Sequence, residues 1–247
     1  MEKTQLFGSV AEFYEYSMKL NCDYSSWADF VVNQIKKYSP SAKTGLDVAC
    51  GSGYFTRALK RSGYDVTGID LQPEMLTQAK KECVKSRLVI PFMQGDMTNL
   101  KTFSKVDFIT VINDGINCLS GDKLVKAFKS MAKCLKKGGV LHFDVSSEYK
   151  LKNVIANNTF CEDDDDYAYI WFNTLLSDSV KMEMSVFLKQ GECYIKRESL
   201  LIEYIHTLDQ LSSALKESGF EIVATQGEMG KPLTDSCERI NITAVKL

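Results

Sequence analysis

Between residues 45 and 145, short apolar runs alternate with amphipathic stretches of helical spacing. The apolar runs predict five strands, at 45–49, 64–69, 88–93, 106–112 and 140–145. Strands that are joined by helices form right-handed crossovers, and such crossovers build a parallel sheet. Pro91 favours an edge position for the third strand. The clearest helix, over 124–135, is expected to end at the basic and glycine residues 136–139.

The two ends of the chain have other patterns. Two amphipathic helices are predicted at 10–18 and 24–35, before the first strand. After about residue 157 the chain becomes rich in β-forming residues with short turn signals, which predicts an antiparallel meander. The predicted strands of the meander cover 167–175, 180–188 and 192–205, and the acidic run 162–166 before them is predicted to be a solvated loop.

A last helix is predicted from the capping-box pattern Thr207-x-x-Gln210 to Gly219, with strands at 220–225 and 240–245 after it. We therefore expect an α/β fold, a doubly wound and mostly parallel sheet with a small antiparallel β insertion. The expected division is 1–157 for the N-terminal helices and the core, 158–205 for the insertion, as a lid or dimer surface, and 206–247 for the last helix and strands.

Composition excludes several classes of function. The 247 residues include 30 basic and 32 acidic side chains, and this near-neutral balance argues against nucleic-acid binding by bulk charge. No apolar run of about 18 residues is present, and the first residues lack a signal-peptide pattern. The eight cysteines are scattered without CxxC spacing, which favours a reducing compartment and no structural metal. We expect a cytoplasmic protein without nucleic-acid or membrane partners.

Acidic residues stand at the predicted strand ends. Asp47 is followed by the glycine turn Gly51-Ser-Gly53, which brings backbone close to a ligand at a helix N-terminus. Asp70 ends the second strand, at the spacing where a carboxylate chelates ribose hydroxyls, and Asp96 ends the third. These positions predict a nucleoside-type ligand.

Two such ligands compete for this arrangement. The dinucleotide-binding fingerprint is G-x-G-x-x-G, but Thr56 stands here at the position of its third glycine. Asp47, directly before the turn, would repel a pyrophosphate and suits a ligand with an ammonium and a sulfonium group. Opposite charges about 4 Å apart are worth roughly 4 kcal/mol at an effective dielectric constant near 20, so the sign of this charge matters. The pattern favours S-adenosylmethionine over NAD.

The segments Asp47–Gly53, Gly68–Leu76, Gln94–Met97 and Leu135–Val140 resemble the ordered motifs of class I S-adenosylmethionine-dependent methyltransferases. The resemblance covers roughly residues 43–145, and residues outside it resemble a bacterial subgroup that acts on small molecules. It implies a Rossmann-like, seven-stranded sheet whose last strand is antiparallel. Ala49 stands where many relatives have glycine, and we expect a negative φ there, which alanine tolerates.

The resemblance also implies a set of cofactor-binding residues: Tyr14, Trp27, Asp47, Ala49, Gly51, Gly53, Asp70, Leu71, Asp96, Met97 and Asn113. Asp47 would reach the amino-acid moiety of the cofactor, and Asp70 the ribose diol. Leu71 would pack on the adenine, whose edge Asp96 and the Met97 backbone would read. The two glycines would let the backbone approach, Asn113 would lie near the methionine end, and the two N-terminal aromatic residues would close the pocket.

The predicted reaction is an in-line transfer of methyl to a nitrogen or oxygen atom of a small acceptor, in which positioning supplies most of the catalysis. Asp114 and His206 are the candidate bases, whereas His142 is expected in the core. Arg197, Glu198 and Glu203 alternate on the meander as outward charges would, although one of them could face a substrate. An NAD-linked oxidoreductase and a non-catalytic, cofactor-binding relative remain as alternatives, and the protein is expected to be a monomer or homodimer.

Overall fold

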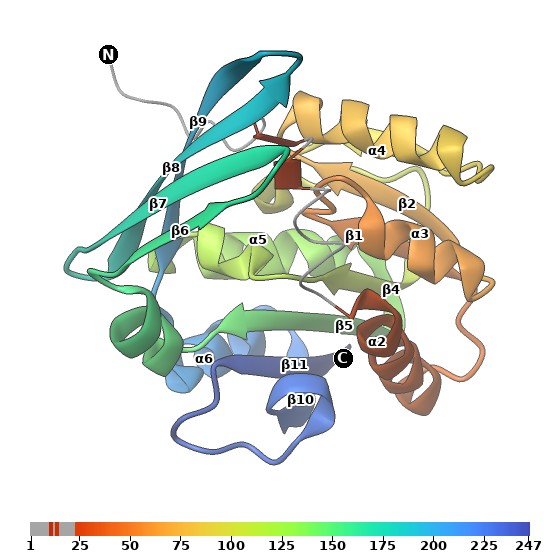
Figure 1. Ribbon diagram of the computed structural model, residues 1–247. Coiled ribbons are helices and arrows are strands. Elements are labelled where there is room, and N and C mark those ends of the chain that lie inside the picture. Colours follow the sequence, from red (N-terminus) through yellow and green to blue (C-terminus); the bar gives the residue numbers. More distant parts are fainter. Residues whose placement is uncertain (1–9, 12, 15–22) are drawn as a thin grey trace.

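A computed structural model describes Val10, Ala11, Phe13, Tyr14 and residues 23–247 (Figure 1). A seven-stranded sheet forms its centre, in the order β10-β11-β5-β4-β1-β2-β3. Its strands are β1 (Thr44–Val48), β2 (Asp65–Asp70), β3 (Phe92–Gln94), β4 (Val106–Val111), β5 (Leu135–Ser146), β10 (Phe220–Gln226) and β11 (Arg239–Lys246). The first five strands are parallel where they pair, and β11 is antiparallel to both of its neighbours. The predicted fold class is confirmed.

Helices cover both faces of this sheet. They are α2 (Tyr24–Tyr38), α3 (Tyr54–Arg61), α4 (Pro73–Lys85), α5 (Gly121–Cys134) and α6 (Leu208–Glu217). The apolar residues of α2 and α3 form one core cluster with one face of the sheet, and those of α5 and α6 form another. The predicted capping box at the start of α6 is present. Most of the helix predicted over 10–18 lies outside the described residues.

A second, antiparallel sheet lies near the carboxyl ends of the parallel strands (Figure 1). Its order is β6-β7-β8-β9, and its strands are β6 (Thr159–Asp163), β7 (Tyr167–Leu175), β8 (Ser179–Gln190) and β9 (Cys193–Tyr204). A π-helix, Lys150–Ile155, leads into it. The prediction of a loop for the whole acidic run was wrong, because Glu162 and Asp163 pair with β7 as the end of an exposed edge strand.

The junction of α5 and β5 also differs from the prediction. The helix ends at Cys134, and Leu135 is already a fully buried strand residue that pairs with Val106. Residues 136–139 then form an irregular step before regular pairing resumes. The Lys246 ammonium group donates to the carbonyls of Ala132 and Leu135, so a distant lysine caps the end of the helix.

Among the described helices, none combines the length and the apolar character that crossing a membrane requires.

Candidate functional site

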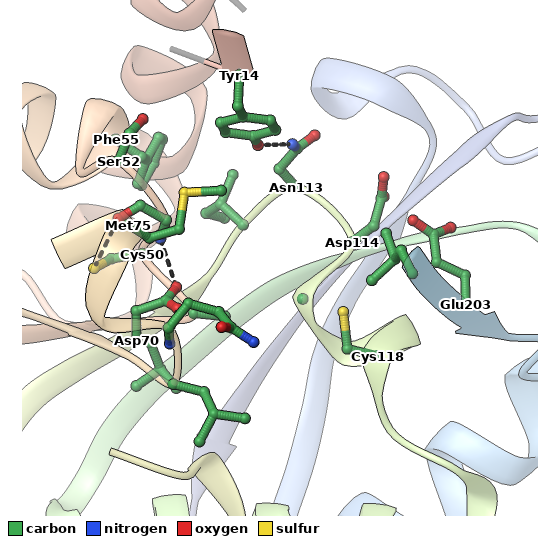
Figure 2. Close-up of a pocket in the computed structure, with 18 of the residues that line it drawn as sticks. Tyr14, Cys50, Ser52, Phe55, Asp70, Met75, Asn113, Asp114, Cys118 and Glu203 are labelled. Atoms are coloured by element: carbon green, nitrogen blue, oxygen red, sulfur yellow. Dashed lines mark hydrogen bonds between the residues drawn. The ribbon is translucent and has the colours of Figure 1, made fainter. Parts of the chain in front are cut away.

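A cavity of about 480 Å³ lies where the carboxyl ends of β1, β2 and β4 meet the second sheet. Its volume is in the range of small-molecule sites, roughly 300–1,000 Å³. The residues predicted from sequence that line it are Tyr14, Asp47, Ala49, Gly51, Asp70, Leu71, Asp96, Met97, Asn113 and Asp114. Figure 2 shows Asp70 on one side of the cavity and Asp114 with Glu203 on the other.

Asp47 is buried at the end of β1 and is held by two hydroxyl groups. The Thr56 hydroxyl donates to its Oδ2 at 2.5 Å, and the Thr110 hydroxyl donates to its Oδ1 at 2.9 Å. Thr56 occupies the third position of the dinucleotide fingerprint, so the residue that departs from that pattern orients this carboxylate. Burial raises the pKa of Asp47 to about 6, and the two hydroxyl bonds act against this rise.

The raised pKa of Asp47 gives a pH-dependent prediction. Between pH 4 and pH 6 the folded protein keeps a proton on Asp47 that the unfolded chain, with a pKa of about 3.9, has released. Its stability should therefore fall by about 1.4 kcal/mol per pH unit as the pH rises through this window. Asp47→Asn lacks this titrating group, so its stability relative to wild type should increase by about 3 kcal/mol from pH 4 to pH 6 and then stay constant.

Urea unfolding of both proteins from pH 4.5 to 7.5 measures this difference. Asp65→Asn is the control, because it removes an exposed carboxylate at the start of β2, away from the cavity. A stability difference between wild type and Asp47→Asn that does not change with pH would contradict the prediction.

Asp70 ends β2 with both carboxylate oxygens hydrogen-bonded to backbone. The Gly51 N–H donates to Oδ2 at 2.7 Å, and the Gln72 N–H donates to Oδ1 at 2.8 Å. Burial raises the pKa of Asp70, and the backbone donors act against this rise. A carboxylate oxygen can accept two hydrogen bonds, so each oxygen keeps an acceptor position for a ligand hydroxyl.

The residues after β2 and β3 form the neighbouring wall. Leu71 is 56% exposed although it is apolar, and it lines the cavity. Asp96 is exposed, caps a short 3₁₀ helix through the Thr98 N–H at 2.7 Å, and is followed by the partly buried Met97. An exposed leucine beside polar strand ends is suited to cover the flat face of a ligand.

Asn113 and Asp114, after β4, both have left-handed backbone, with φ of 64° and 65°. Asparagine and aspartate are the non-glycine residues that adopt this conformation most readily. Their backbone N–H groups donate to the carboxylate of Asp144, at 2.7 and 3.2 Å. The Asn113 amide also donates to the Tyr14 hydroxyl at 2.6 Å, which ties the N-terminal segment to the site (Figure 2).

The guanidinium of Arg239 lies between two carboxylates beneath this turn. It donates to Asp114 at 2.6 Å and also to Asp144, and it lies 4.7 Å from the centre of the Trp27 ring. Burial acts to raise the pKa of Asp114, but the charges of Arg239 and Lys150 hold it below its ordinary value. Burial raises the pKa of Asp144 to about 6. The ion pair with Arg239 keeps the Asp114 carboxylate ionised and takes up its hydrogen-bonding capacity. This favours a positioning role for Asp114 over proton transfer.

Three predicted site residues do not line the cavity. Trp27 is buried beneath Arg239. Gly53 begins α3, and a Cβ there would lie 2.9 Å from the Phe92 ring, so its role is close packing. His206 is buried against the backbone of the segment that follows Asp114, and burial lowers its pKa. His142 is fully buried in the central sheet, as predicted.

The expectation of a negative φ at Ala49 was wrong. Its φ is 56°, because the chain turns sharply between the end of β1 and Gly51, which also has a positive φ. An alanine in this region carries strain of the order of 1 kcal/mol, and such strain is often found at ligand sites.

The sequence analysis did not single out Glu203 from the three meander charges of which one could face a substrate. The Glu203 side chain lines the cavity and is 8% exposed. Burial raises its pKa to about 8, and the negative charge of Asp114 adds to the rise. A signal is present in the sequence, because Ser199, Leu201 and Glu203 recur every second residue, as one face of a strand does. Arg197 belongs to the same alternating set of residues but is exposed, so the spacing alone does not distinguish it from the residues that line the cavity.

Known proteins are similar to this chain in sequence and in fold. Residues 46–139 match the family described as methyltransferase domain. A Geobacillus protein, itself only provisionally assigned as a methyltransferase, is 30% identical over 246 residues, which cover 97% of this chain and 99% of the relative. The crystal structure of an S-adenosylmethionine-dependent methyltransferase from Clostridium acetobutylicum is 30% identical, with a TM-score of 0.89 over 97% of this chain and 98% of the other.

A third likeness concerns the fold alone. The structure of an amino pentose methyltransferase from Micromonospora echinaspora with S-adenosylmethionine bound is 19% identical, with a TM-score of 0.77 over 95% of this chain and 97% of that one. The family follows from the 30% sequence identity to the Geobacillus and Clostridium relatives along nearly the whole chain and from the cavity at the carboxyl ends of the strands. The chain belongs to the S-adenosylmethionine-dependent methyltransferases, and S-adenosylmethionine is its cofactor.

Proposed function

We propose that this enzyme transfers methyl to a nitrogen or oxygen atom of a small molecule that binds between the two sheets. The observation that carries the proposal is the two-sided cavity. Strand ends of the first sheet supply one side, and the inner face of the second sheet supplies the other. An enclosed site of this size suits a small acceptor better than a polymer.

The residues of the first side fit the cofactor. The free acceptor positions of the Asp70 carboxylate match the ribose diol, and the exposed Leu71 matches an adenine face. The Asp47 carboxylate, held by two hydroxyl groups, is complementary to the positively charged ammonium group of the amino-acid moiety. When bound, S-adenosylmethionine supplies a methyl group on a positively charged sulfur. The residues of the chain would then position the sulfur and its methyl group and exclude water around them.

The second side is the acceptor site of our proposal. Its wall is mostly apolar and is made by Trp171, Met182, Met184 and Leu201. One protein that shares the fold is an amino pentose methyltransferase, and this likeness supports a small-molecule acceptor here. We propose a division of labour in which residues 1–157 and 206–247 hold the cofactor and residues 158–205 select the acceptor.

Calorimetry with S-adenosylhomocysteine and with NADH tests the cofactor part of this proposal. We expect heat of binding with the first ligand and none with the second, because Asp47 opposes a pyrophosphate. The reverse result would support the oxidoreductase alternative. Cofactor binding without methyl transfer to any of a broad set of amines and alcohols would support the non-catalytic alternative.

We also propose that the enzyme acts in the cytoplasm, as a monomer or homodimer. The described cysteines are free thiols, which fits a reducing compartment.

A further inference from the structure

Glu203 is a buried acidic residue of the second sheet, and it takes no part in the proposed binding of the cofactor. It lies on β9, opposite Val180 of β8, and its side chain faces the cavity beside Asp114 (Figure 2). Among the residues that the structure describes, no hydrogen-bond or ion-pair partner reaches its carboxyl group. A buried carboxyl group without a partner costs free energy that a bound ligand can recover.

The charges around Glu203 do not balance. Three carboxyl groups, of Asp114, Asp144 and Glu203, lie near two cations, of Arg239 and Lys150. Arg239 is paired with the two aspartates, and the Lys150 ammonium donates to the Ser146 hydroxyl at 3.2 Å. One carboxyl group is therefore in excess in this part of the cavity, and a proton or a cationic ligand group would balance it.

The surroundings of Glu203 favour an organic cation. Met182 and Leu201 face each other across β8 and β9 on the same side of the sheet, and Met184 and Trp171 continue this surface on the next pair of strands. Polarisable sulfur atoms and an aromatic ring can contact an ammonium group and the apolar body that carries it. A strongly hydrated inorganic cation would instead need several oxygen ligands.

We propose that Glu203 is a catalytic residue, whose carboxylate binds the ammonium group of an amine acceptor and takes the proton that the nitrogen must lose. This inference rests on the function proposed above and narrows the acceptor to an amine. An N–H bond breaks and an O–H bond forms on Glu203, which leaves a lone pair on the nitrogen. That lone pair forms the N–C bond to the methyl carbon, while the electrons of the broken S–C bond stay on sulfur.

The acid strengths agree with an amine acceptor. The pKa of Glu203 is raised to about 8, and an alkyl ammonium group has a pKa near that of lysine, about 10.4. These values lie close enough for proton transfer at neutral pH. A hydroxyl group, with a pKa near the value of about 15.7 for water, is too weak an acid for this carboxylate.

The test uses sinefungin, an analogue of S-adenosylmethionine that carries a carbon-bound amine in place of the methylated sulfur. Its amine probes the position where the acceptor nitrogen meets the methyl group. We expect Glu203→Gln to lower the preference for sinefungin over S-adenosylhomocysteine at least tenfold by calorimetry, while the affinity for S-adenosylhomocysteine changes less than twofold. Glu198→Gln, an exposed acid on the same strand, is the matched control and should leave both affinities unchanged.

The outcomes separate the two proposals. If S-adenosylhomocysteine does not bind the wild-type protein, both proposals fail. If it binds and Glu203→Gln keeps the wild-type preference for sinefungin, the role of Glu203 fails and the proposed function stands. A second measurement uses the wild type alone: its preference for sinefungin should decrease as the pH falls below about 8, where Glu203 takes up its proton. A preference that does not change with pH overturns the role as well.

Discussion

Arg239→Ala is expected to lower the free energy of unfolding by about 3–5 kcal/mol, because it leaves buried carboxylates without their partner. Asp144 is fully buried, and Asp114 lies beside it under the same guanidinium. The same change also removes the planar group that covers the Trp27 ring. For a chain of this size the melting temperature should fall by roughly 10 °C.

Thermal and urea unfolding measure this loss, with Arg197→Ala as the control. Arg197 is exposed on β9, so its replacement should change the stability by less than about 0.5 kcal/mol. Arg239→Lys should recover part of the loss, because it keeps the charge and gives up the planar donor geometry. If Arg239→Ala and Arg197→Ala unfold alike, the buried network does not hold the two turns together.

Asp70→Ala is expected to weaken the binding of S-adenosylhomocysteine by about 100-fold or more. Each hydrogen bond from a ribose hydroxyl to this carboxylate is worth about 1.5–3 kcal/mol, and two of them are lost together. The substitution also removes the acceptor of the Gly51 N–H, so the glycine turn loses part of its support. Calorimetry of the wild type and the variant at one salt concentration measures the change.

Asp65→Ala, on the same strand, is the matched control. Asp65 is exposed and pairs with Lys60 at the opposite end of β2, so its loss should leave the affinity within twofold. Asp70→Asn keeps one accepting oxygen and should fall between wild type and Asp70→Ala. An unchanged affinity in Asp70→Ala would show that the ribose is held elsewhere.

The central sheet could be predicted from the sequence because the pattern of its strands is local. Each buried parallel strand is a short apolar run between a turn and a helix, and the run at 106–112 matches β4 almost residue for residue. β6 was missed because it ends in Glu162 and Asp163, and acidic residues have low strand propensity. Pairing with β7 overrides that propensity, and the sequence before β7 carries no sign of it.

The residues of the first sheet that line the cavity were predicted better than those of the second sheet, for a related reason. Asp47 and Asp70 stand at fixed distances from the glycine turn, so one local pattern places them together. Glu203 lines the cavity only because its part of β9 packs near the first sheet. This packing joins segments that lie far apart in the sequence, so no local pattern predicts it. The same packing puts Trp27 under Arg239 and buries His206 away from the cavity.

The alternation of side chains along β8 and β9 has a consequence for protein engineering. Met182 and Met184 face the cavity, as do Ser199, Leu201 and Glu203, while the residues between them point to the opposite side of the second sheet. None of these five belongs to the strand ends of the first sheet, where we propose that the cofactor binds. A combinatorial library at the four codons other than that of Glu203 therefore changes the proposed acceptor wall and keeps the proposed catalytic and cofactor-binding residues, so variants can be sorted by acceptor with a single, constant methyl donor.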